Sequence, residues 1–362
     1  MTSRPPAIVT IAALLGDGIG PEIVTATMRV LTEAGRKHGI TIEFDVLPSG
    51  LSALETHDST LPPETLDRLP TYAGWILGPV ATHLYPSGDR RYLNPSGYLR
   101  TQFQLYANIR PARSLPGVKS VSSNLDLVIV RENTEGFYAD RNLLDGNGEF
   151  RPDEDTVLSL RVITRRACMR VAHRAFELAR QRGGQRTVTA VHKANVLRRG
   201  DTLFLDCCRT VAAEYPDVTL NDVHVDACAM YLITRGTDFD VIVTTNMFGD
   251  ILSDEAAGLV GGLGLAPSLN QGDERAMAQA VHGSAPDIAH LHTANPVAEI
   301  LSGKLLLDWL AARASFPALL DAGRSIEVAI ERVLKVGTVL TPDLGGTAGT
   351  SEMTQAIVDA LL

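Results

Sequence analysis

The chain opens with two apolar, β-rich runs separated by an amphipathic stretch. Residues 7–15 and 41–47 have the composition of strands, and residues 21–38 carry apolar side chains at the period of a helix. Pro21 at the first helical position and Glu22 in the first turn are typical helix-start residues. This pattern predicts a β–α–β unit at the beginning of the chain.

Further strand-like runs alternate with helical patterns over most of the sequence. Helices are predicted at 164–182, at 201–214 and in the stretch after Gly249. The remaining predicted strands lie at 73–77, 125–130, 187–191, 222–225 and 241–245. Such alternation predicts an α/β architecture with largely parallel strands. The turn-rich residues 140–155 interrupt the rhythm, either as an arm or hairpin that a partner subunit covers or as a solvated loop.

The loop between the first strand and the first helix is rich in glycine. Its sequence, Gly16-Asp17-Gly18-Ile19-Gly20, invites comparison with a classical Rossmann fingerprint, with Glu43 or Asp45 at a plausible distance for a ribose. That fingerprint needs a third glycine where this chain has Pro21. The sequence therefore disfavours a classical Rossmann fold, although the loop still offers backbone N–H groups to a polar ligand.

Composition narrows the class of protein. The 362 residues are 45% hydrophobic, which is enough for about two domains with large cores. A net charge of −9 argues against general nucleic-acid binding. No apolar run approaches the length of a membrane span, and the start of the chain does not resemble a secretion signal, so we expect a cytoplasmic protein. The cysteines at 168, 207, 208 and 228 lack metal-site or disulfide spacing and are expected to be reduced structural thiols.

Two aspartates suggest a metal site. Asp250 and Asp254 follow the predicted strand at 241–245 and lie four residues apart, hence on one face of a helix. Like charges placed in this way repel unless a cation lies between them, and oxygen ligands suit Mg²⁺ or Mn²⁺. The alternative is that both acids merely complement the positive end of the helix dipole.

Three arginines, in YLRTQ, YANIRP and VIVREN, lie in similar settings, and two of them close strand-like runs. We expect Arg100, Arg110 and Arg131 to converge on one anion, because guanidinium groups bind carboxylates with two parallel hydrogen bonds. Each is alternatively a solvated surface residue. Lys193 follows another strand, where loss of water contact can lower its pKa as a general base requires, or it is simply exposed. Asp226 offers a third carboxylate at the end of a predicted strand.

Nine motifs occur in order along the chain: GDGIGPE, LRxxxxLYANIRP, VRENTEG, HKANV, VDACAM, TTNMFGDILSD, GGLGLAPS, HGSAPDIAxxxxANP and TPDLGG. In these motifs and their spacing the chain resembles the isocitrate/isopropylmalate dehydrogenase family of metal-dependent, β-decarboxylating hydroxyacid dehydrogenases. The resemblance covers nearly the whole chain. It implies a two-domain fold with mixed, largely parallel sheets. Residues 1–105 plus 261–362 would form a large cofactor-binding domain, and residues 106–260 a small domain with the dimer interface and an arm at about 140–160.

The resemblance also implies the substrate and metal ligands. The residues implied to bind the carboxylates of a malate-type substrate are Arg100, Arg110 and Arg131. The residues implied to bind Mg²⁺ or Mn²⁺ are Asp226, Asp250 and Asp254, with Asp226 coming from the second subunit of an obligate homodimer. Lys193, from that same second subunit, would act with Asp226 to take the proton from the C2 hydroxyl. Tyr138 would protonate the enol that remains after CO₂ departs.

A cofactor site is implied in the same way, formed by His282, Gly283, Ala285, Asp287, Asn295 and Asn195. An aspartate at position 287 can accept hydrogen bonds from ribose hydroxyls and would repel a 2′-phosphate, so the cofactor is predicted to be NAD. The alternative for Asp287 is structural, because Ala-Pro-Asp is a good turn sequence.

The substrate is less clearly indicated. In this family the residues just before Arg100 contact the variable group of the substrate, and here they include Asn94 and Ser96. Polar donors there favour a polar or anionic group over isopropyl, although Asn-Pro-Ser-Gly is also a good turn. The predicted reaction is therefore oxidative decarboxylation of isocitrate or homoisocitrate. The alternatives are tartrate, malate, 3-isopropylmalate or a specialised analogue as substrate, and a non-enzymatic regulatory subunit of a hetero-oligomeric dehydrogenase.

Overall fold

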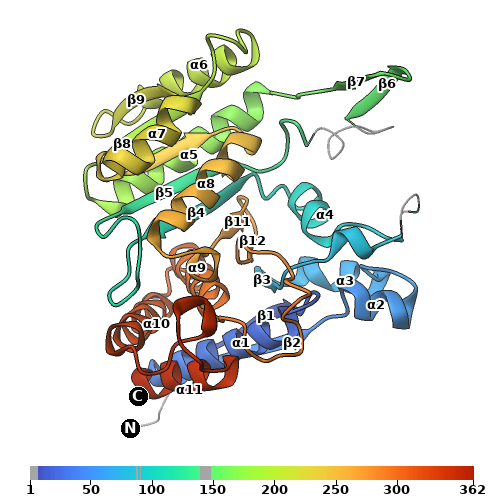
Figure 1. The fold of residues 1–362 in the computed structure, drawn as a ribbon, viewed down its shortest axis with the longest axis vertical. Coiled ribbons are helices and arrows are strands. Elements are labelled where there is room, and N and C mark those ends of the chain that lie inside the picture. Colours follow the sequence, from blue (N-terminus) through green and yellow to red (C-terminus); the bar gives the residue numbers. More distant parts are fainter. Residues whose placement is uncertain (1–6, 87–88, 90, 139–147) are drawn as a thin grey trace.

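The computed structural model describes residues 7–86, 89, 91–138 and 148–362. Helices and strands alternate along most of this chain (Figure 1). The strands are β1 (Ala7–Leu14), β2 (Ile40–Val46), β3 (Gly74–Leu77), β4 (Ala107–Arg113), β5 (Asp126–Glu132), β6 (Glu149–Asp153), β7 (Thr156–Ser159), β8 (Thr187–His192), β9 (Thr219–His224), β10 (Val241–Thr244), β11 (Leu269–Gln271) and β12 (Ala276–Ala278). The helices are α1 (Gly20–Lys37), α2 (Gly50–His57), α3 (Pro63–Arg68), α4 (Pro95–Gln102), α5 (Arg165–Arg182), α6 (Gly200–Ala212), α7 (Val225–Arg235), α8 (Asn246–Val260), α9 (Val297–Ala314), α10 (Pro317–Val336) and α11 (Thr350–Leu361).

In the described part of the chain, ten strands form one mixed sheet. Their order is β2-β1-β3-β12-β11-β4-β5-β10-β8-β9. The pairs at both ends are parallel, and antiparallel pairing is confined to β12–β11, β11–β4 and β4–β5. This confirms the predicted α/β class with largely parallel strands. It also departs from a classical Rossmann sheet, as the glycine loop indicated.

The sheet is continuous between the two regions that the sequence assigns to separate domains. Strand β4 pairs with β11 across that line, with Ile109 opposite Leu269. Strands β1, β2, β3, β11 and β12 come from the two ends of the chain, and the other five come from its middle. The division into residues 1–105 plus 261–362 and residues 106–260 stays a prediction.

Local signals explain where the helices start and end. In α1, Pro21 and Glu22 occupy the first turn as predicted, and the apolar face packs against α9, α10 and α11. Helix α5 begins after Thr164, whose hydroxyl accepts a hydrogen bond from the Ala167 N–H, and ends at Gly183 in the left-handed conformation. The large apolar side chains of Trp75, Phe176 and Phe204 are fully buried in the core, as their size favours.

Two predicted boundaries are wrong. Helix α8 begins at Asn246 rather than after Gly249, so its first turn holds no acidic residue. Asp250 therefore lies in the second turn, where the helix dipole has less effect on it. Strand β9 ends at His224, and Asp226 lies in the first turn of α7 rather than at the end of a strand. The first correction shifts the start of a helix that was already expected to carry Asp250, and the second moves Asp226 from a strand onto a helix.

The predicted arm is described only from residue 148 onwards. Strands β6 and β7 form a hairpin that extends away from the rest of the chain (Figure 1). Its Phe150 and Val157 side chains are 50% and 59% exposed. Residues 139–147, the first part of the predicted arm, lie outside the described residues. The hairpin is present, and its coverage by a partner subunit stays a prediction.

The four cysteines are buried and unpaired, as expected of structural thiols. Burial raises the pKa of Cys228 to about 12, which keeps that thiol protonated. Among the described helices, none combines the length and the apolar composition needed to cross a lipid bilayer.

A fully buried carboxyl group connects α9 to the end of β12. Glu299 accepts a hydrogen bond from the Ala280 N–H at 2.7 Å, and burial raises its pKa to about 8. Between pH 4.5 and 8 the unfolded chain thus loses a proton that the folded chain keeps. The contribution of Glu299 to folding stability therefore falls as pH rises through this range.

We expect Glu299→Gln to remove this pH dependence, because an amide resembles the protonated carboxyl group. Relative to the parent, the variant should gain about 3 kcal/mol of unfolding free energy between pH 5 and pH 8. Urea unfolding of both proteins at pH 5, 6.5 and 8 measures the difference, in which other titrating groups cancel. Parallel pH profiles would show that Glu299 is ionised in the folded protein at neutral pH.

Candidate functional site

The two aspartates predicted to bind metal lie on one face of α8 and meet two arginines from the sheet. The Arg110 Nη1 atom lies 3.1 Å from Asp250 Oδ1 and 3.5 Å from Asp254 Oδ1. Arg131 forms an ion pair with Asp250 through Nη1. Adjacent antiparallel strands β4 and β5 carry these arginines, which are 7% and 2% exposed. Arg110 and Arg131 thus meet at one carboxylate and are buried rather than solvated, and their binding of a substrate anion stays a prediction.

Tyr138 completes this cluster. Its hydroxyl donates a hydrogen bond to Asp250 Oδ2 at 2.9 Å, and its ring lies 5.6 Å from the guanidinium carbon of Arg131. Helix α8 approaches β5 closely at Gly249, where a Cβ atom would lie 2.7 Å from the Arg131 side chain. A glycine is therefore needed here for Asp250 to reach both the arginines and the tyrosine.

The electrostatics of the two aspartates differ. Burial alone would raise the pKa of Asp250, but Arg131, Arg110, the Tyr138 hydroxyl and Arg100 together hold it below its usual value. For Asp254, burial outweighs Arg110 and raises the pKa. Burial and the neighbouring Arg131 lower the pKa of Arg110 to about 10. Arg100 also lowers the pKa of this carboxyl group, although only Arg110 and Arg131 form ion pairs with Asp250.

Arg100 and Ser96 lie one turn apart on α4 and share one partner. The Oε1 atom of the buried Gln279 accepts hydrogen bonds from Ser96 Oγ at 2.8 Å and from Arg100 Nη2 at 3.0 Å. Ser96 was predicted to be a donor for the substrate, but its hydrogen is already donated to Gln279, which leaves its oxygen lone pairs. Asn94 caps α4 by accepting the Gly97 N–H at 3.1 Å, as expected for the turn interpretation.

Lys193 and Asp226 form a second pair. Lys193 Nζ lies 2.5 Å from Asp226 Oδ1, and this lysine lowers the pKa of the Asp226 carboxyl. The loop that carries Lys193 is fixed by the fully buried Asp201, which accepts the Lys193 N–H at 2.6 Å and pairs with Arg161, also at 2.6 Å. The Lys193 side chain is 25% exposed, so it is neither fully buried nor merely a surface residue.

Two of the three predicted metal ligands lie together in the described part of the chain. Asp250 and Asp254 offer oxygen donors of the kind that hard divalent cations prefer. Within the described residues, however, no group of three or more Asp, Glu, His or Cys side chains is arranged to hold a metal ion. Asp226 lies with Lys193 and does not join the other two aspartates in such a group. The donor chemistry of Asp250 and Asp254 fits Mg²⁺ or Mn²⁺.

The candidate cofactor loop packs against the glycine loop. Ile19 donates its N–H to the Ser284 carbonyl at 3.0 Å, and a Cβ atom on Gly18 would lie 2.0 Å from that oxygen. Gly18 and Ala285 have φ values of +59° and +39°. Two motifs far apart in sequence thus form one surface, on which Gly283 and Asp287 are exposed. An exposed carboxylate is suited to accept hydrogen bonds from ribose hydroxyls.

The other candidate cofactor residues are placed differently. Burial lowers the pKa of His282, whose Nδ1 lies 3.1 Å from the Gly283 carbonyl oxygen. Asn295 is buried, donates to Asp343 Oδ2 at 2.9 Å and accepts the Val297 N–H at the start of α9. Asn195 is exposed in the loop after Lys193, and no hydrogen bond between it and residues 282–287 occurs in the described chain.

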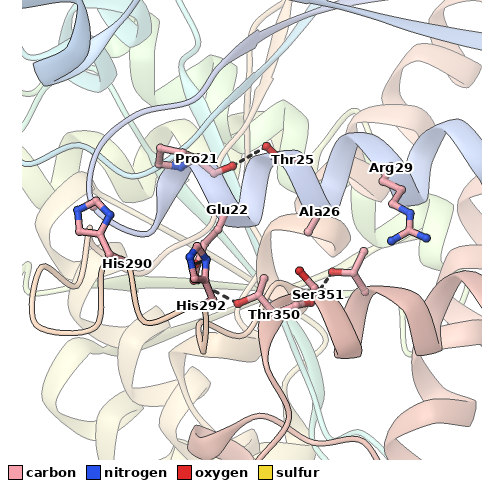
Figure 2. Close-up of a pocket in the computed structure, with 11 residues that line it drawn as sticks. Pro21, Glu22, Thr25, Ala26, Arg29, His290, His292, Thr350 and Ser351 are labelled. Carbon is pink, nitrogen blue, oxygen red and sulfur yellow. Dashed lines mark hydrogen bonds and ion pairs between the residues drawn. The ribbon is translucent and has the colours of Figure 1, made fainter.

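A pocket of about 410 Å³ is lined by residues of α1, by His290 and His292, and by the start of α11. Figure 2 shows Glu22, His292 and Thr350 facing one another beside it. Glu22 accepts hydrogen bonds from the Ala294 N–H at 3.1 Å and the Thr350 hydroxyl at 3.2 Å, and it lies 3.3 Å from His292 Nδ1. Glu22 was predicted only as a helix-start acid, yet it also joins α1, α11 and residues 292–294.

Several residues of the site were missed in the sequence. Asn246 accepts hydrogen bonds from Arg131, and Ser253 accepts one from Arg110 at 2.6 Å. Both belong to the TTNMFGDILSD motif, which gave a signal for them. Gln279 and Asp201 lie in stretches with no distinguishing pattern, and only the fold shows what they contact.

Comparisons with known proteins identify the family of the chain. The family model described as isocitrate/isopropylmalate dehydrogenase matches residues 10–357. The chain is 43% identical over 347 residues to a 3-isopropylmalate dehydrogenase of Methanothermobacter thermautotrophicus, covering 96% of this chain and 97% of that protein. It is 42% identical over 355 residues to the mitochondrial NAD isocitrate dehydrogenase catalytic subunit 5 of Arabidopsis thaliana, covering 98% and 88%.

Among solved structures, the crystal structure of isocitrate dehydrogenase from Methylococcus capsulatus matches with a TM-score of 0.87 and 40% identity, covering 98% of this chain and 99% of that one. The names of the relatives include different substrates, which agree in being hydroxyacids that are oxidised and decarboxylated. The chain belongs to the isocitrate/isopropylmalate dehydrogenase family, whose members are decarboxylating dehydrogenases.

Proposed function

We propose that this protein catalyses the NAD-dependent oxidative decarboxylation of a 3-substituted malate with the help of Mg²⁺ or Mn²⁺. The observation that carries the proposal is the convergence of Arg110, Arg131 and Tyr138 on Asp250, beside Asp254 on the same helix face. Positive side chains for an anion, oxygen ligands for a cation and a phenol as proton donor thus meet at one place. These are the groups that this reaction requires.

The arginines would bind the carboxylates of the substrate. When Asp250 and Asp254 serve a cation, Arg110 and Arg131 have donors left for carboxylate oxygens. Arg100, held by Gln279, would add a third guanidinium group. Their positions on strands and on a helix, rather than on loops, suit them to orient a small anion.

Proton transfer would use groups on both sides of the substrate. Lys193 and Asp226 would together take the proton of the C2 hydroxyl as hydride leaves C2 for the nicotinamide, and the carboxylate of the pair would receive it because an ammonium group has no acceptor. The ketone that forms lies β to a carboxylate, so breaking the C–C bond to CO₂ leaves an enolate. Tyr138 would then donate a proton to C3. A divalent cation, when bound, would supply Lewis-acid stabilisation of the negative charge that develops on oxygen.

The cofactor would lie along the surface that the two loops form. The exposed Asp287 carboxylate is suited to a dinucleotide with free ribose hydroxyls. A phosphate at the 2′ position would meet the negative charge of Asp287. We therefore propose NAD rather than NADP, as the name of the Arabidopsis relative says of that protein.

The incomplete metal site supports a homodimer with shared active sites. Among the described residues, Asp226, which pairs with Lys193, does not form a group with Asp250 and Asp254. Helix α7, which carries Asp226, exposes Met230 and Ile233 at 52% and 62%, and Ile251 on α8 is 59% exposed. An apolar surface next to both halves of the site would be buried if a second copy supplied Lys193 and Asp226.

Isocitrate and homoisocitrate are the first candidates for the substrate, and one observation favours a second candidate, tartrate. Because the Ser96 hydrogen is donated to Gln279, Ser96 offers an acceptor to its ligand. The 3-hydroxyl of tartrate is a donor, whereas a carboxylate is not. Initial rates with isocitrate, homoisocitrate, tartrate, malate and 3-isopropylmalate will separate these substrates. Turnover of tartrate alone would remove isocitrate and homoisocitrate, and preference for 3-isopropylmalate would contradict both.

We expect chelation to abolish activity. Removing divalent cations with EDTA should lower the rate of NADH formation to background, and excess Mg²⁺ or Mn²⁺ should restore it. The reason is that the reaction then lacks the Lewis acid that Asp250 and Asp254 would bind. The measurement is absorbance at the NADH band before and after metal is added back. Full activity in EDTA would contradict the proposal and favour a metal-independent dehydrogenase.

The non-enzymatic alternative, a regulatory subunit of a hetero-oligomeric dehydrogenase, makes a different prediction. The chain purified alone would then form no NADH with any of the five substrates at saturating Mg²⁺ and NAD. Tyr138, Lys193 and the three aspartates are all present, which favours an active enzyme.

A further inference from the structure

Gln279 connects two side chains that the proposed function places at the substrate. It follows β12 and is 5% exposed. One atom, Oε1, accepts hydrogen bonds from Ser96 and Arg100, which lie four residues apart and therefore on one face of α4. Because guanidinium nitrogens only donate, the Gln279 atom that faces Arg100 has to be the amide oxygen. The orientation of the amide is thus fixed by chemistry.

The position of Gln279 is itself fixed by the backbone. Its N–H donates to the Ser268 carbonyl at 3.2 Å, and its carbonyl accepts the Ser268 hydroxyl at 2.6 Å. The next residue, Ala280, donates its N–H to Glu299 in α9. A side chain anchored in this way can hold α4 and its arginine at a constant distance from the sheet.

The charge of residue 279 matters as much as its position. A carboxylate at this place would accept the same two hydrogen bonds but would offset the positive charge of Arg100. The neutral amide orients the guanidinium group and adds no negative charge of its own. A substrate with two or three carboxylates is attracted more strongly to the site with the amide.

We propose that Gln279 is a positioning residue that orients Arg100 and Ser96 toward the substrate while leaving the positive charge of Arg100 available to its carboxylates. This inference rests on the proposed function, because it assumes that Arg100 binds the substrate. It assigns to Gln279 an effect on anion affinity rather than on the chemical step, since it touches no reacting atom.

Gln279→Glu tests the role of charge, with the substrate that the wild type prefers and with malate. We expect KM to rise by about tenfold or more while kcat changes by less than about threefold, because binding is weakened equally in the ground state and the transition state. The rise should be larger for a tricarboxylate than for malate, a dependence on substrate charge that mere loss of packing does not produce. The matched control is Gln104→Glu, which places the same charge beside Arg170 on the surface, where Gln104 Oε1 lies 3.2 Å from Arg170 Nη1.

Gln279→Met separates orientation from charge, because it is neutral but removes the acceptor. It should lower kcat/KM by about tenfold with every substrate alike. If the glutamate variant does not fold, the methionine variant alone tests whether Gln279 positions Arg100 and Ser96. Calorimetric titration of both variants with malate and Mg²⁺ measures affinity without turnover. If the wild type neither binds nor oxidises any malate derivative, the proposed function and this inference both fail. If the wild type does so and both variants keep its KM, only the inference about Gln279 is overturned.

Discussion

Asp250→Asn is expected to lower kcat/KM by about a thousandfold or more, because a single carboxylate serves several partners in the site. Asp250 pairs with Arg110 and Arg131 and accepts a hydrogen bond from the Tyr138 hydroxyl. Asparagine keeps the shape but removes the negative charge that a divalent cation needs from an oxygen ligand. Steady-state kinetics at saturating Mn²⁺ measure the loss, and calorimetric titration with Mn²⁺ measures the weakened binding of the cation.

The same substitution should also affect stability. Arg110 and Arg131 are almost fully buried and would lose the charge that offsets their mutual repulsion, which should cost about 1–3 kcal/mol of unfolding free energy. Circular dichroism therefore has to establish that the variant is folded at the assay temperature. The control is Glu255→Gln on the same helix, which lies about 100° around the axis from Asp254 and should keep nearly full activity. A folded Asp250→Asn protein with normal turnover would contradict the proposed site.

The regular part of the fold is well predicted because its signals are local. Each predicted strand is found, since apolar, β-branched runs of strand length are bounded by turn residues. Strands β11 and β12, with three residues each, are too short to show a pattern, and β4 contains Pro111 and two arginines. These three strands make the antiparallel centre of the sheet. The sequence therefore gives no signal for the antiparallel strands that join the two parallel ends of the sheet.

The candidate site is only partly predictable from the sequence. Arg110 and Arg131 were grouped by their similar sequence settings, but they meet because β4 and β5 are antiparallel neighbours, a pairing that the sequence does not show. Gln279 could not be predicted, because its contact with Ser96 spans 183 residues. The prediction that Ser96 donates a hydrogen bond to the substrate was wrong for the same reason. Only the distant Gln279 shows that the hydrogen of the Ser96 hydroxyl is already donated. Long-range contacts, rather than residue types, determined what could not be predicted.

Mixing two inactive variants should restore activity if each site combines residues from two chains. In a heterodimer of Lys193→Met and Asp250→Asn subunits, one site has Asp250 from the first chain and Lys193 from the second, and is intact. The other site carries both substitutions. Random exchange of subunits makes half of the dimers heterodimers with one active site of two, so about a quarter of wild-type activity is expected.

The gain in activity on mixing is large because each variant alone should be almost inactive. Its size depends on which subunit supplies each residue of the site. Tyr138→Phe mixed with Asp250→Asn is the matched control, since hydrogen-bonded Tyr138 and Asp250 belong to the same chain and no heterodimer has an intact site. Native mass spectrometry establishes that heterodimers form in both mixtures. Heterodimers of Lys193→Met and Asp250→Asn that stay inactive would show that Lys193 serves the site of its own chain. The separation of Lys193 and Asp226 from Asp250 would then have to be closed by movement within one chain rather than by a second copy.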